Sequence, residues 1–343
     1  MNTPVPPASP ATLMLRETHE APAAIARLLD RNGAALARIG QRLRAAPPSV
    51  VVTCARGSSD HAATYGKYLI ETLTGTPVAS HALSVSSLYA ARVRAEGALC
   101  IAISQSGRSP DLLSAVAAHR RGGAYTVALV NDVKSPLAAE VDEAIALEAG
   151  PELSVAATKS FIAALGALAA LTARWTQDAA LLAALPQLPA ALDAVLATTD
   201  PQAALPMFRD VRNLFAIGRG LGLGIAQEVG LKFKETCGLH AEGFSSAEIR
   251  HGPMAIVEDG FPVLGFATSG PAGQDVREAL SLFASRGART HLFDTEAMGI
   301  ATHPVLEPLL LIQAFYPLAE ALSRARGLDP DSPPHLRKVT QTV

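Results

Sequence analysis

The sequence repeats a pattern of strand, glycine turn and helix at a separation of 163 residues, and this repeat constrains the fold more than any other feature. Arg56-Gly57 follows the apolar run SVVVTC, and Arg219-Gly220 follows the run RNLFAI. The next apolar run in each half ends at Ser106-Gly107 and at Ser269-Gly270, again 163 residues apart. A third pair of runs, YTVALVND and RTHLFDTE, aligns within about a residue of the same offset. These agreements predict a duplicated unit of about 160 residues.

Apolar runs that alternate with helical stretches indicate the fold class. Short, continuous apolar runs are typical of parallel strands covered on both faces, and the helical crossovers between them are right-handed. We therefore expect an α/β protein of two tandem doubly wound (flavodoxin-like) subdomains with parallel sheets, at residues 14–175 and 207–326. Residues 176–206 are interpreted as a helical connector cut by prolines and residues 1–13 as a disordered tail. The Pro-rich residues 327–343 form either a loose tail or a segment tucked into a site.

The composition is that of an ordinary globular protein. Of the 343 residues, 49% are hydrophobic and 17% are charged, and the formal net charge is −2. A nucleic-acid-binding protein needs a basic patch to replace phosphate counterions, so we expect no nucleic-acid partner. The N-terminus lacks the regions of a signal peptide, and the most membrane-like stretch, residues 161–173, is too short for a bilayer and is typical of a buried helix. We therefore expect a cytoplasmic protein with no membrane partner.

The cysteines indicate neither a disulfide framework nor a metal site. Cys54, Cys100 and Cys237 lie far apart and form no CxxC pair, which is typical of buried, reduced thiols. No pair of His or Cys residues has metal-ligand spacing with a supporting partner, so we predict no metal.

The first candidate site is the loop from Ser104 to Ser109, which follows the strand LCIAI and opens the helix DLLSAVAAHR. Unpaired N–H groups and the helix dipole favour an anion at such a helix start, so the loop predicts a phosphate site. Alternatively, one of the serines merely caps the helix. The matching loop of the second half, residues 268–273, has lost most of its hydroxyls, so only one half is equipped for phosphate. The residues predicted to bind phosphate here are Ser104, Gln105, Ser106 and Ser109.

The second candidate site is the turn after the first strand, at the sheet end where open α/β sheets bind ligands. Gly57 permits close backbone approach, and Ser58 and Ser59 can hydrogen-bond sugar hydroxyls or phosphate. The alternative is a tight turn with a serine cap.

The third candidate is a polar stripe on the predicted helix 224–237. Glu228, Lys232 and Glu235 fall at i, i+4 and i+7, which places them on one face. Such a stripe is either a solvated Glu–Lys pair or, near an active cleft, a carboxylate that accepts a proton beside a lysine that keeps it ionised.

The fourth candidate is the segment 240–253. Glu248, Arg250 and His251 cluster beside a Gly-Pro breaker, which predicts a loop or helix end, and a histidine there can move protons near neutral pH. For His240, in contrast, a structural role is as consistent with the sequence as a role in proton transfer.

Together these segments resemble the sugar isomerase (SIS) domain family. The resemblance extends to the isomerase half of glutamine–fructose-6-phosphate aminotransferase and to stand-alone relatives, including the type II glucosamine-6-phosphate deaminases. The residues that carry it span nearly the whole chain in family order: ISQSGRSPD, LSVAATKSF, AIGRG, QEVGLKFKETCGLHAEGFSSAEIRHGPMAI and HLRKVTQTV.

The resemblance implies a role for each matching position. Glu235 matches the carboxylate that moves a proton between C1 and C2, and Lys232 and Glu228 match its supporting residues. His251 matches a histidine that opens the sugar ring from the neighbouring subunit, which implies a homodimer with a shared active site. Lys338 matches a lysine on a C-terminal lid that closes over the site and can form a Schiff base with the ketose. The positions implied to contact substrate are the phosphate loop, Ser58, Ser59, Arg56, Gly57, Val155 and Ala156.

Two departures from the large enzyme of the family bear on the reaction. The isomerase-like sequence begins almost at once, at Met14, so we expect no glutaminase activity from this chain. The first turn reads CARGSSDHA, with Arg56 before the glycine instead of Cys-Gly-Thr-Ser, which leaves the sugar open.

The leading hypothesis is conversion of glucosamine 6-phosphate to fructose 6-phosphate and ammonia, with a sugar phosphate as the small-molecule partner and no cofactor. Alternatives within the enzyme class are an ammonia- or glutamine-dependent aminotransferase-type isomerase and a fructosamine-phosphate deglycase. An alternative of another class is a non-catalytic sugar-phosphate sensor.

Overall fold

The computed structural model describes residues 11–338, and its two parallel sheets repeat one strand order. The first sheet has the order β2-β1-β3-β4-β5 and the second the order β7-β6-β8-β9. The order 2-1-3-4-5 is that of flavodoxin-like doubly wound sheets, which confirms the predicted fold class. The strands are β1 (Val50–Cys54), β2 (Val78–Ser80), β3 (Ala98–Ser104), β4 (Tyr125–Val130), β5 (Glu143–Ala146), β6 (Asn213–Gly218), β7 (His240–Ser245), β8 (Pro262–Ala267) and β9 (Arg289–Asp294).

The sequence repeat corresponds to equivalent strands of the two sheets. β1 and β6 are the second strands of their sheets, and β3 and β8 lie next to them in parallel register, for example Val52 with Cys100 and Ala216 with Leu264. Every residue of β3 and of β8 is buried, as expected for apolar strands covered on both faces.

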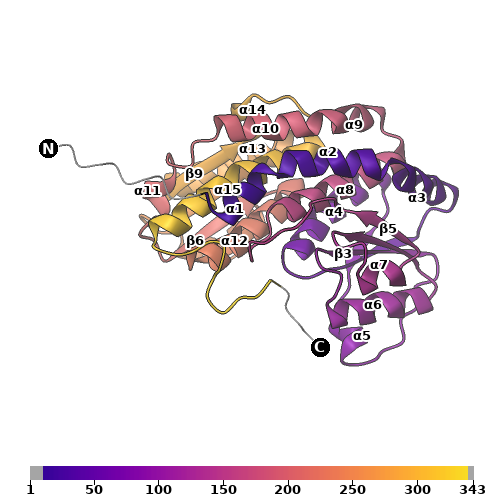
Figure 1. Cartoon of the computed structure of the whole chain (residues 1–343). Coiled ribbons are helices and arrows are strands. Elements are labelled where there is room, and N and C mark those ends of the chain that lie inside the picture. The colour runs from indigo at the N-terminus through magenta and orange to yellow at the C-terminus, as the bar shows by residue number, and fades with distance from the viewer. Residues whose placement is uncertain (1–10, 339–343) are drawn as a thin grey trace.

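Helices cover both sheets and join them. Figure 1 shows the first sheet with α5, α6 and α7 in one lobe and the second sheet with α13 in the other. Helices α2, α8, α10 and α15 pack side by side across the two lobes. The longer helices are α1 (Leu13–His19), α2 (Ala21–Arg31), α3 (Gly33–Ala45), α4 (Ser58–Thr74), α6 (Pro110–Arg121), α8 (Lys159–Thr176), α10 (Leu188–Thr198), α12 (Leu223–Cys237), α13 (Gly270–Ala284) and α15 (Glu307–Ala325).

The remaining helical segments are short. They comprise single or double turns at loop ends: α5 (Ser84–Ser87), α7 (Pro136–Glu140), α9 (Ala179–Ala184), α11 (Leu205–Phe208), α14 (Thr295–Met298), and the 3-10 turns η1 (Leu185–Gln187), η2 (Gly220–Gly222), η3 (Glu248–Arg250), η4 (Pro253–Ile256) and η5 (Pro304–Leu306).

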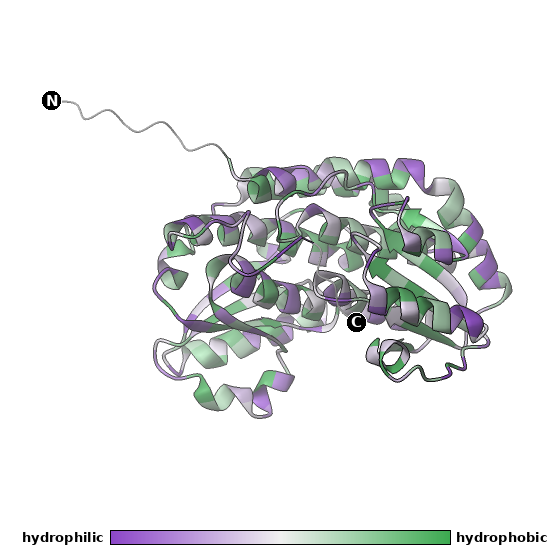
Figure 2. Ribbon diagram, turned by 60° about the horizontal axis from the view of Figure 1, so that its bottom comes forward, coloured by the Kyte–Doolittle hydropathy of each residue, from purple (hydrophilic) through white to green (hydrophobic). Residues whose placement is uncertain are grey.

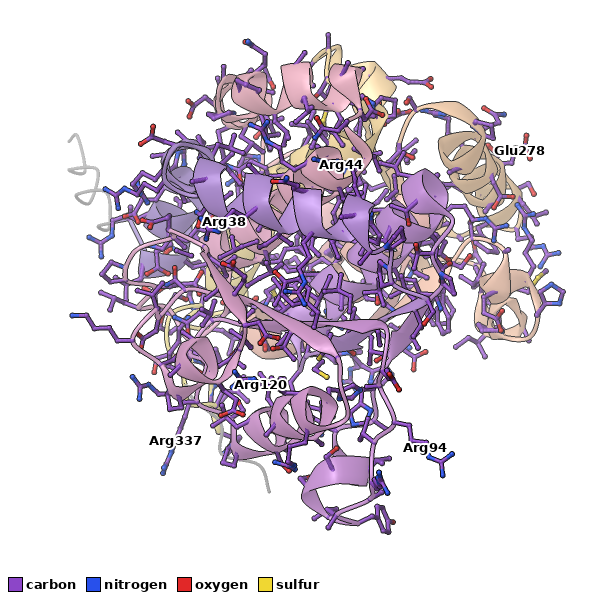
Figure 3. The ribbon with its side chains drawn as sticks, turned by 90° about the vertical axis from the view of Figure 1, so that its right-hand side faces the viewer. Arg38, Arg44, Arg94, Arg120, Glu278 and Arg337 are labelled. Carbon is purple, nitrogen blue, oxygen red and sulfur yellow. The ribbon has the colours of Figure 1, made fainter. Side chains whose placement is uncertain are left out.

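Hydrophobic side chains gather between the helices and sheets. In Figure 2 the strands are mostly green, and the outward surfaces of the surrounding helices carry the purple, hydrophilic residues. Figure 3 shows Arg38, Arg94 and Arg120 at the surface of the first lobe. Glu278, a residue of α13, lies at the right-hand edge of the same view. Hydrophobic residues inside and charged residues at the surface are what we expect of an ordinary globular protein, the class indicated by the composition.

Within residues 11–338, two helical stretches are long and apolar enough to cross a membrane by length and composition, residues 179–198 and 304–325. The second stretch is 94% buried inside the protein, so it is a core helix. The first is the proline-cut connector, and it comprises α9, η1 and α10 rather than one continuous helix. The segment 161–173, which the sequence predicts to be a buried helix, is buried within α8.

Both ends of the described chain meet next to one loop of the first subdomain. The Asp331 carboxylate accepts hydrogen bonds of 2.7 Å from the N–H groups of Leu13 and Met14 at the start of α1. The Asp331 carbonyl accepts a hydrogen bond of 3.2 Å from the N–H of Val155. Most of the predicted N-terminal tail, residues 1–10, and residues 339–343 of the predicted C-terminal tail lie outside the described residues.

Candidate active site

A cavity of about 380 Å³ lies at the carboxyl ends of β1 and β3. This volume is in the range of small-ligand sites. Three predicted segments meet there: the turn after β1, the serine loop after β3, and the polar stripe of α12. The lining residues are Arg56, Gly57, Ser58, Ser59, Ile103, Ser104, Gln105, Ser106, Ser109, Leu112, Glu152, Val155, Ala157, Lys232, Glu235 and Lys338.

The three serines of the loop, Ser104, Ser106 and Ser109, all line this cavity. The Ser104 hydroxyl accepts a hydrogen bond of 2.9 Å from the Gly107 N–H. Gly107 has φ +63°, and a Cβ there would lie 2.2 Å from the Ser135 hydroxyl oxygen, so only glycine fits. Ser109 occupies the N-cap position of α6, but its side chain makes no capping hydrogen bond. The Ser109 hydroxyl is therefore available to a ligand, which weakens the alternative that it serves only as a cap.

The sister loop of the second subdomain carries its own internal anion. The N–H of Ser269 donates a hydrogen bond of 2.6 Å to the buried carboxylate of Glu307. The Thr295 hydroxyl donates to the same carboxylate at 3.1 Å. A protein carboxylate thus occupies the position at this loop where an anionic ligand would bind, which accounts for the loss of hydroxyls noted in the sequence.

Arg56 is held over the cavity by the start of α6. Its Nε lies 3.0 Å and one of its terminal nitrogens 2.9 Å from the same oxygen of Asp111. The Asp111 side chain is buried, whereas the Arg56 side chain is 57% exposed. The ion pair fixes the guanidinium at the cavity wall, with nitrogens still able to donate to a ligand.

The polar stripe of α12 lies on one helical face, as its spacing predicts. The Lys232 ammonium directly contacts the Glu235 carboxylate and lies 3.4 Å from the carboxylate of Glu228. Lys232 and Glu228 are fully buried, and Glu235 is partly exposed to the cavity. Burial lowers the pKa of Lys232, but the charges of Glu228 and Glu235 outweigh it and raise the pKa above its usual value. The alternative of a solvated surface pair is therefore wrong.

Glu228 has a further partner that comes from the first subdomain. His61, in the first turn of α4, places Nδ1 3.0 Å from Glu228 Oε2. Glu228 itself lies beneath the cavity wall rather than in it.

Lys338 reaches the cavity from the C-terminal segment. Its ammonium lies 3.0 Å from the carboxylate of Glu152 and donates a hydrogen bond of 2.7 Å to the carbonyl of Ser154. Figure 3 shows the neighbouring Arg337 pointing away from the protein. The described part of the tail, residues 327–338, is therefore tucked against the site rather than loose.

The sequence analysis did not single out Glu152, although its carboxylate lines the cavity. It accepts hydrogen bonds from the Ser160 hydroxyl at 2.6 Å and from the N–H groups of Thr158 and Ser160 at 3.0 Å. Burial raises the pKa of Glu152, but the Lys338 charge and these hydrogen bonds lower it below its usual value. The signal that could have found it is an acidic residue directly before the motif LSVAATKSF.

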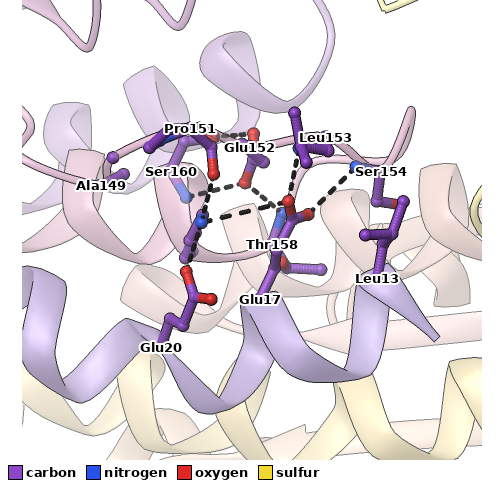
Figure 4. Close-up of polar contacts among 12 residues, drawn as sticks. Leu13, Glu17, Glu20, Ala149, Pro151, Glu152, Leu153, Ser154, Thr158 and Ser160 are labelled. Atoms are coloured by element: carbon purple, nitrogen blue, oxygen red, sulfur yellow. Dashed lines mark hydrogen bonds and ion pairs between the residues drawn. The ribbon is translucent and has the colours of Figure 1, made fainter. Parts of the chain in front are cut away.

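The loop around Glu152 is braced from its other side by the N-terminal helices. The Glu17 carboxylate accepts hydrogen bonds from the N–H groups of Leu153 and Ser154, and the buried Lys159 ammonium lies 2.5 Å from Glu20 (Figure 4). Burial raises the pKa of Glu17. These contacts fix the backbone that carries Val155 and Ala157 at the cavity.

Three predicted site residues do not line this cavity: Glu228, as described above, and also Ala156 and His251. Ala156 is buried, and its neighbour Ala157 lines the cavity instead. His251 is exposed at the end of η3, on a loop that lies outside the cavity of its own chain. The structure therefore brings the serine loop, Glu235, Lys232 and Lys338 together, and it leaves His251 apart from them.

The described residues contain one group of side chains with metal-ligand chemistry, Cys54, Cys100 and His119, whose ligand atoms lie within 4.8 Å of one another. The sequence spacing did not anticipate this group because its members come from three different elements. All three side chains are buried, and both cysteines belong to an apolar core, where thiols pack as small hydrophobic groups. The three cysteines are free and buried, as predicted.

The fold and the site define a protein of the SIS domain class. The sequence profile of the SIS domain family matches residues 47–174 and 207–301, and the chain belongs to that family. Glutamine–fructose-6-phosphate aminotransferase [isomerizing] of Halobacterium salinarum is 33% identical over 356 residues, which cover 95% of this chain and 58% of that protein. The same enzyme of Methanothermobacter thermautotrophicus is 33% identical over 343 residues, covering 95% of this chain and 56% of that protein. The chain thus spans a little over half the length of these relatives.

Solved structures agree with this placement. A Silicibacter pomeroyi protein provisionally named a phosphosugar isomerase is 46% identical, with a TM-score of 0.86 over 94% of this chain and 100% of that one. The C-terminal domain of glucosamine-fructose-6-phosphate aminotransferase from Francisella tularensis is 25% identical, with a TM-score of 0.85 over 96% of this chain and 100% of that one.

Proposed function

We propose that this protein converts glucosamine 6-phosphate and water to fructose 6-phosphate and ammonia. The observation that carries the proposal is the position of Glu235, whose carboxylate lines the same cavity as the serine loop and contacts the buried ammonium of Lys232. A fixed carboxylate that faces a phosphate-binding loop is suited to moving a proton along the carbon chain of a bound sugar phosphate. The named activity of the aminotransferase relatives, which joins isomerisation to amino transfer on fructose 6-phosphate, supports an amino sugar.

The phosphate of the substrate would bind at the loop from Ser104 to Ser109. Hydroxyls, the Gln105 amide and the N-terminus of α6 supply donors there, and the Arg56 guanidinium adds positive charge at the cavity wall. Ser58 and Ser59, at the start of α4, lie in position to hydrogen-bond sugar hydroxyls.

The chemical steps use Glu235 as the base and then as the acid. In the open-chain amino aldose, Glu235 takes the proton from C2, which gives an enolamine spanning C1 and C2. O1 gains a proton as the enolamine forms, and return of the C2 proton to C1 with loss of a proton from the nitrogen produces a CH₂OH group at C1 and an imine at C2. Water then adds to C2, and ammonia leaves to give the ketose. Acid–base participation of this kind contributes about 10²–10⁴ in rate.

The ring-opening step is assigned to His251 of a second copy. His251 is exposed and lies outside the cavity of its own chain, so it acts in this scheme only if a homodimer places it at the partner's cavity. The homodimer, the cytoplasmic location and the absence of a cofactor remain predictions.

A second candidate is the reverse assembly of glucosamine 6-phosphate from fructose 6-phosphate and supplied ammonia, which the likeness to the aminotransferase relatives favours. Both directions share the same proton transfer. The deglycase and the sensor predicted as alternatives have no structural observation that favours them over these two.

The decisive experiment measures ammonia and ketose formation from a panel of phosphosugars. Wild-type protein is incubated with glucosamine 6-phosphate, a fructosamine phosphate, or fructose 6-phosphate plus ammonium. We expect ammonia and fructose 6-phosphate in equal amounts from the first substrate. Release of ammonia or amine from the fructosamine phosphate alone would replace the proposal with the deglycase, and tight binding without turnover of any substrate would replace it with the sensor.

A further inference from the structure

We propose that His61 is a positioning residue for Glu235, acting through Glu228 and Lys232, and that its Nδ1–H donor is the required feature. The inference rests on the function proposed above because it concerns the same carboxylate.

A continuous line of contacts joins His61 to the cavity. His61 Nδ1 lies 3.0 Å from Glu228 Oε2, Glu228 Oε1 lies 3.4 Å from the Lys232 ammonium, and Lys232 contacts Glu235. An ionised carboxylate only accepts hydrogen bonds, so the shared proton belongs to the imidazole Nδ1. The line runs from the first subdomain through two fully buried side chains to the carboxylate that lines the cavity.

Close packing of two helices fixes the start of this line. A Cβ built on Gly224 of α12 would lie 2.6 Å from the carbonyl oxygen of His61 and 3.1 Å from the N–H nitrogen of Tyr65. The two helices therefore approach closely at this glycine. One turn further along α12, Glu228 meets the His61 side chain. The same first turn of α4 carries Ser58 and Ser59, so substrate contacts and this donor share one helix start.

The position of the Lys232 ammonium depends on the other hydrogen bonds that the carboxylates of Glu228 and Glu235 receive. Among residues 11–338, Glu228 Oε1 forms no hydrogen bond and faces the Lys232 ammonium at 3.4 Å, whereas Oε2 has a hydrogen bond from His61, the one that this buried carboxylate receives. Without that donor, Glu228 attracts the Lys232 ammonium more strongly, and the ammonium is drawn away from Glu235. Glu235 then loses the contact that orients it in the cavity.

Two substitutions of similar polarity separate a positioning role from a packing role. In His61→Asn the amide nitrogen takes nearly the place of Nδ1 and can still donate to Glu228. In His61→Gln the amide lies at the place of Nε2, so the donor is misplaced. We expect His61→Asn to keep a kcat near that of the wild type, and His61→Gln to lower kcat about 10- to 100-fold with KM unchanged, the scale of a misplacement of about 1 Å. The matched control is His240→Gln, at an exposed histidine 3.8 Å from Glu242.

Crystal structures of both variants provide a readout that does not depend on turnover. We expect the Lys232–Glu235 contact to persist in His61→Asn and to be broken in His61→Gln. Wild-type kcat and an intact contact in His61→Gln would overturn the inference, as would equal losses of kcat and melting temperature in both variants. If the wild type deaminates no amino-sugar phosphate, the proposed function is wrong, but the role of His61 can still be tested. The presence or absence of the Lys232–Glu235 contact in the two crystal structures is then the test.

Discussion

Lys338 and Glu152 are 186 positions apart in the chain, yet the Lys338 ammonium lies 3.0 Å from the Glu152 carboxylate at the cavity. Glu152 is fully buried, and the Lys338 side chain is 25% exposed. The Schiff base with the ketose that the family resemblance implies for Lys338 would require this ion pair to open. The pair therefore holds the lysine beside the cavity.

The first prediction concerns the pH dependence of stability. The pKa of Glu152 is lower in the folded protein than its ordinary value of 4.5, because Lys338 and the hydrogen bonds to its carboxylate outweigh its burial. Such a group stabilises the fold above its unfolded pKa, and this contribution is lost as the pH falls through the folded pKa. We expect the melting temperature to fall more steeply for the wild type than for Glu152→Gln as the pH drops from about 6 to about 3. Parallel curves, with exposed Glu278→Gln as the control, would contradict this assignment.

The second prediction concerns Glu235. Because its carboxylate is assigned both proton transfers, Glu235→Gln is expected to lower kcat for glucosamine 6-phosphate by about 10²–10⁴. Binding of fructose 6-phosphate, measured by calorimetry, should change little, since the serine loop, where the phosphate is proposed to bind, is on another element. Near-wild-type turnover in Glu235→Gln would show that another group moves the proton. The Glu278→Gln variant again serves as the matched control, because Glu278 is an exposed residue of α13.

The third prediction compares two glycines that line or shape the cavity. Gly57 and Gly107 both have positive φ, at +54° and +63°. A Cβ at Gly57 meets no atom within 4 Å, whereas one at Gly107 would lie 2.7 Å from the Cβ of Ser135. We expect Gly57→Ala to cost about 1–3 kcal/mol of unfolding free energy, because Gly57 has φ +54° and ψ −132°, and Gly107→Ala to cost more, because a steric clash is added there. Urea denaturation measures both, and equal costs would mean that the loop relaxes around the new methyl group.

The fourth prediction concerns the thiols. Burial raises the pKa of Cys237 to about 11 and also contributes to the raised pKa of Cys54. Because the thiolate is the reactive form, the native protein should react slowly with an aromatic disulfide reagent at neutral pH, and it should release three thiols after denaturation. Rapid reaction of the native protein would show that one of these sites opens readily.

The fifth prediction tests the shared site. His251→Ala and Glu235→Gln subunits should each be inactive alone. If His251 completes the site of a partner, mixed dimers contain one intact site and recover part of the wild-type activity. Absence of recovery, once exchange of subunits has been verified by native mass spectrometry, would rule out the shared-site proposal.

The fold was largely predictable because the repeat and the apolar runs are local signals. Buried parallel strands such as β3 need continuous apolar residues, and the glycine turns recur at the same offset in both halves. The serine loop and the stripe Glu228, Lys232 and Glu235 were predictable for the same reason, since their chemistry lies within one turn or one helical face. The roles assigned to these residues remain predictions.

The partners of these residues were not predictable, because they come from distant segments. Asp111 belongs to a helix start and meets Arg56 only through the packing of α6 beside β1. His61 meets Glu228 only because the two subdomains pack through α4 and α12 at Gly224. Glu152 is a single acidic residue in a loop, and its ion pair with Lys338 joins positions 186 residues apart in the chain. Contacts between residues so far apart in the chain leave no periodic pattern in the sequence from which they could be predicted.

The contacts of Asp331 affect how shortened versions of this chain should be interpreted. Asp331 accepts hydrogen bonds from the N–H groups of Leu13 and Met14 at the beginning of α1, and from the N–H of Val155 beside the cavity. Helix α1 in turn holds the loop that carries Glu152, through Glu17. A deletion after Gly327 therefore removes Lys338, takes away two of the hydrogen bonds at the start of α1 and removes a backbone contact beside the cavity at once. Loss of activity in such a truncation would not identify the lysine as its cause. A point substitution at Lys338, with Asp331 left in place, is the change that isolates it.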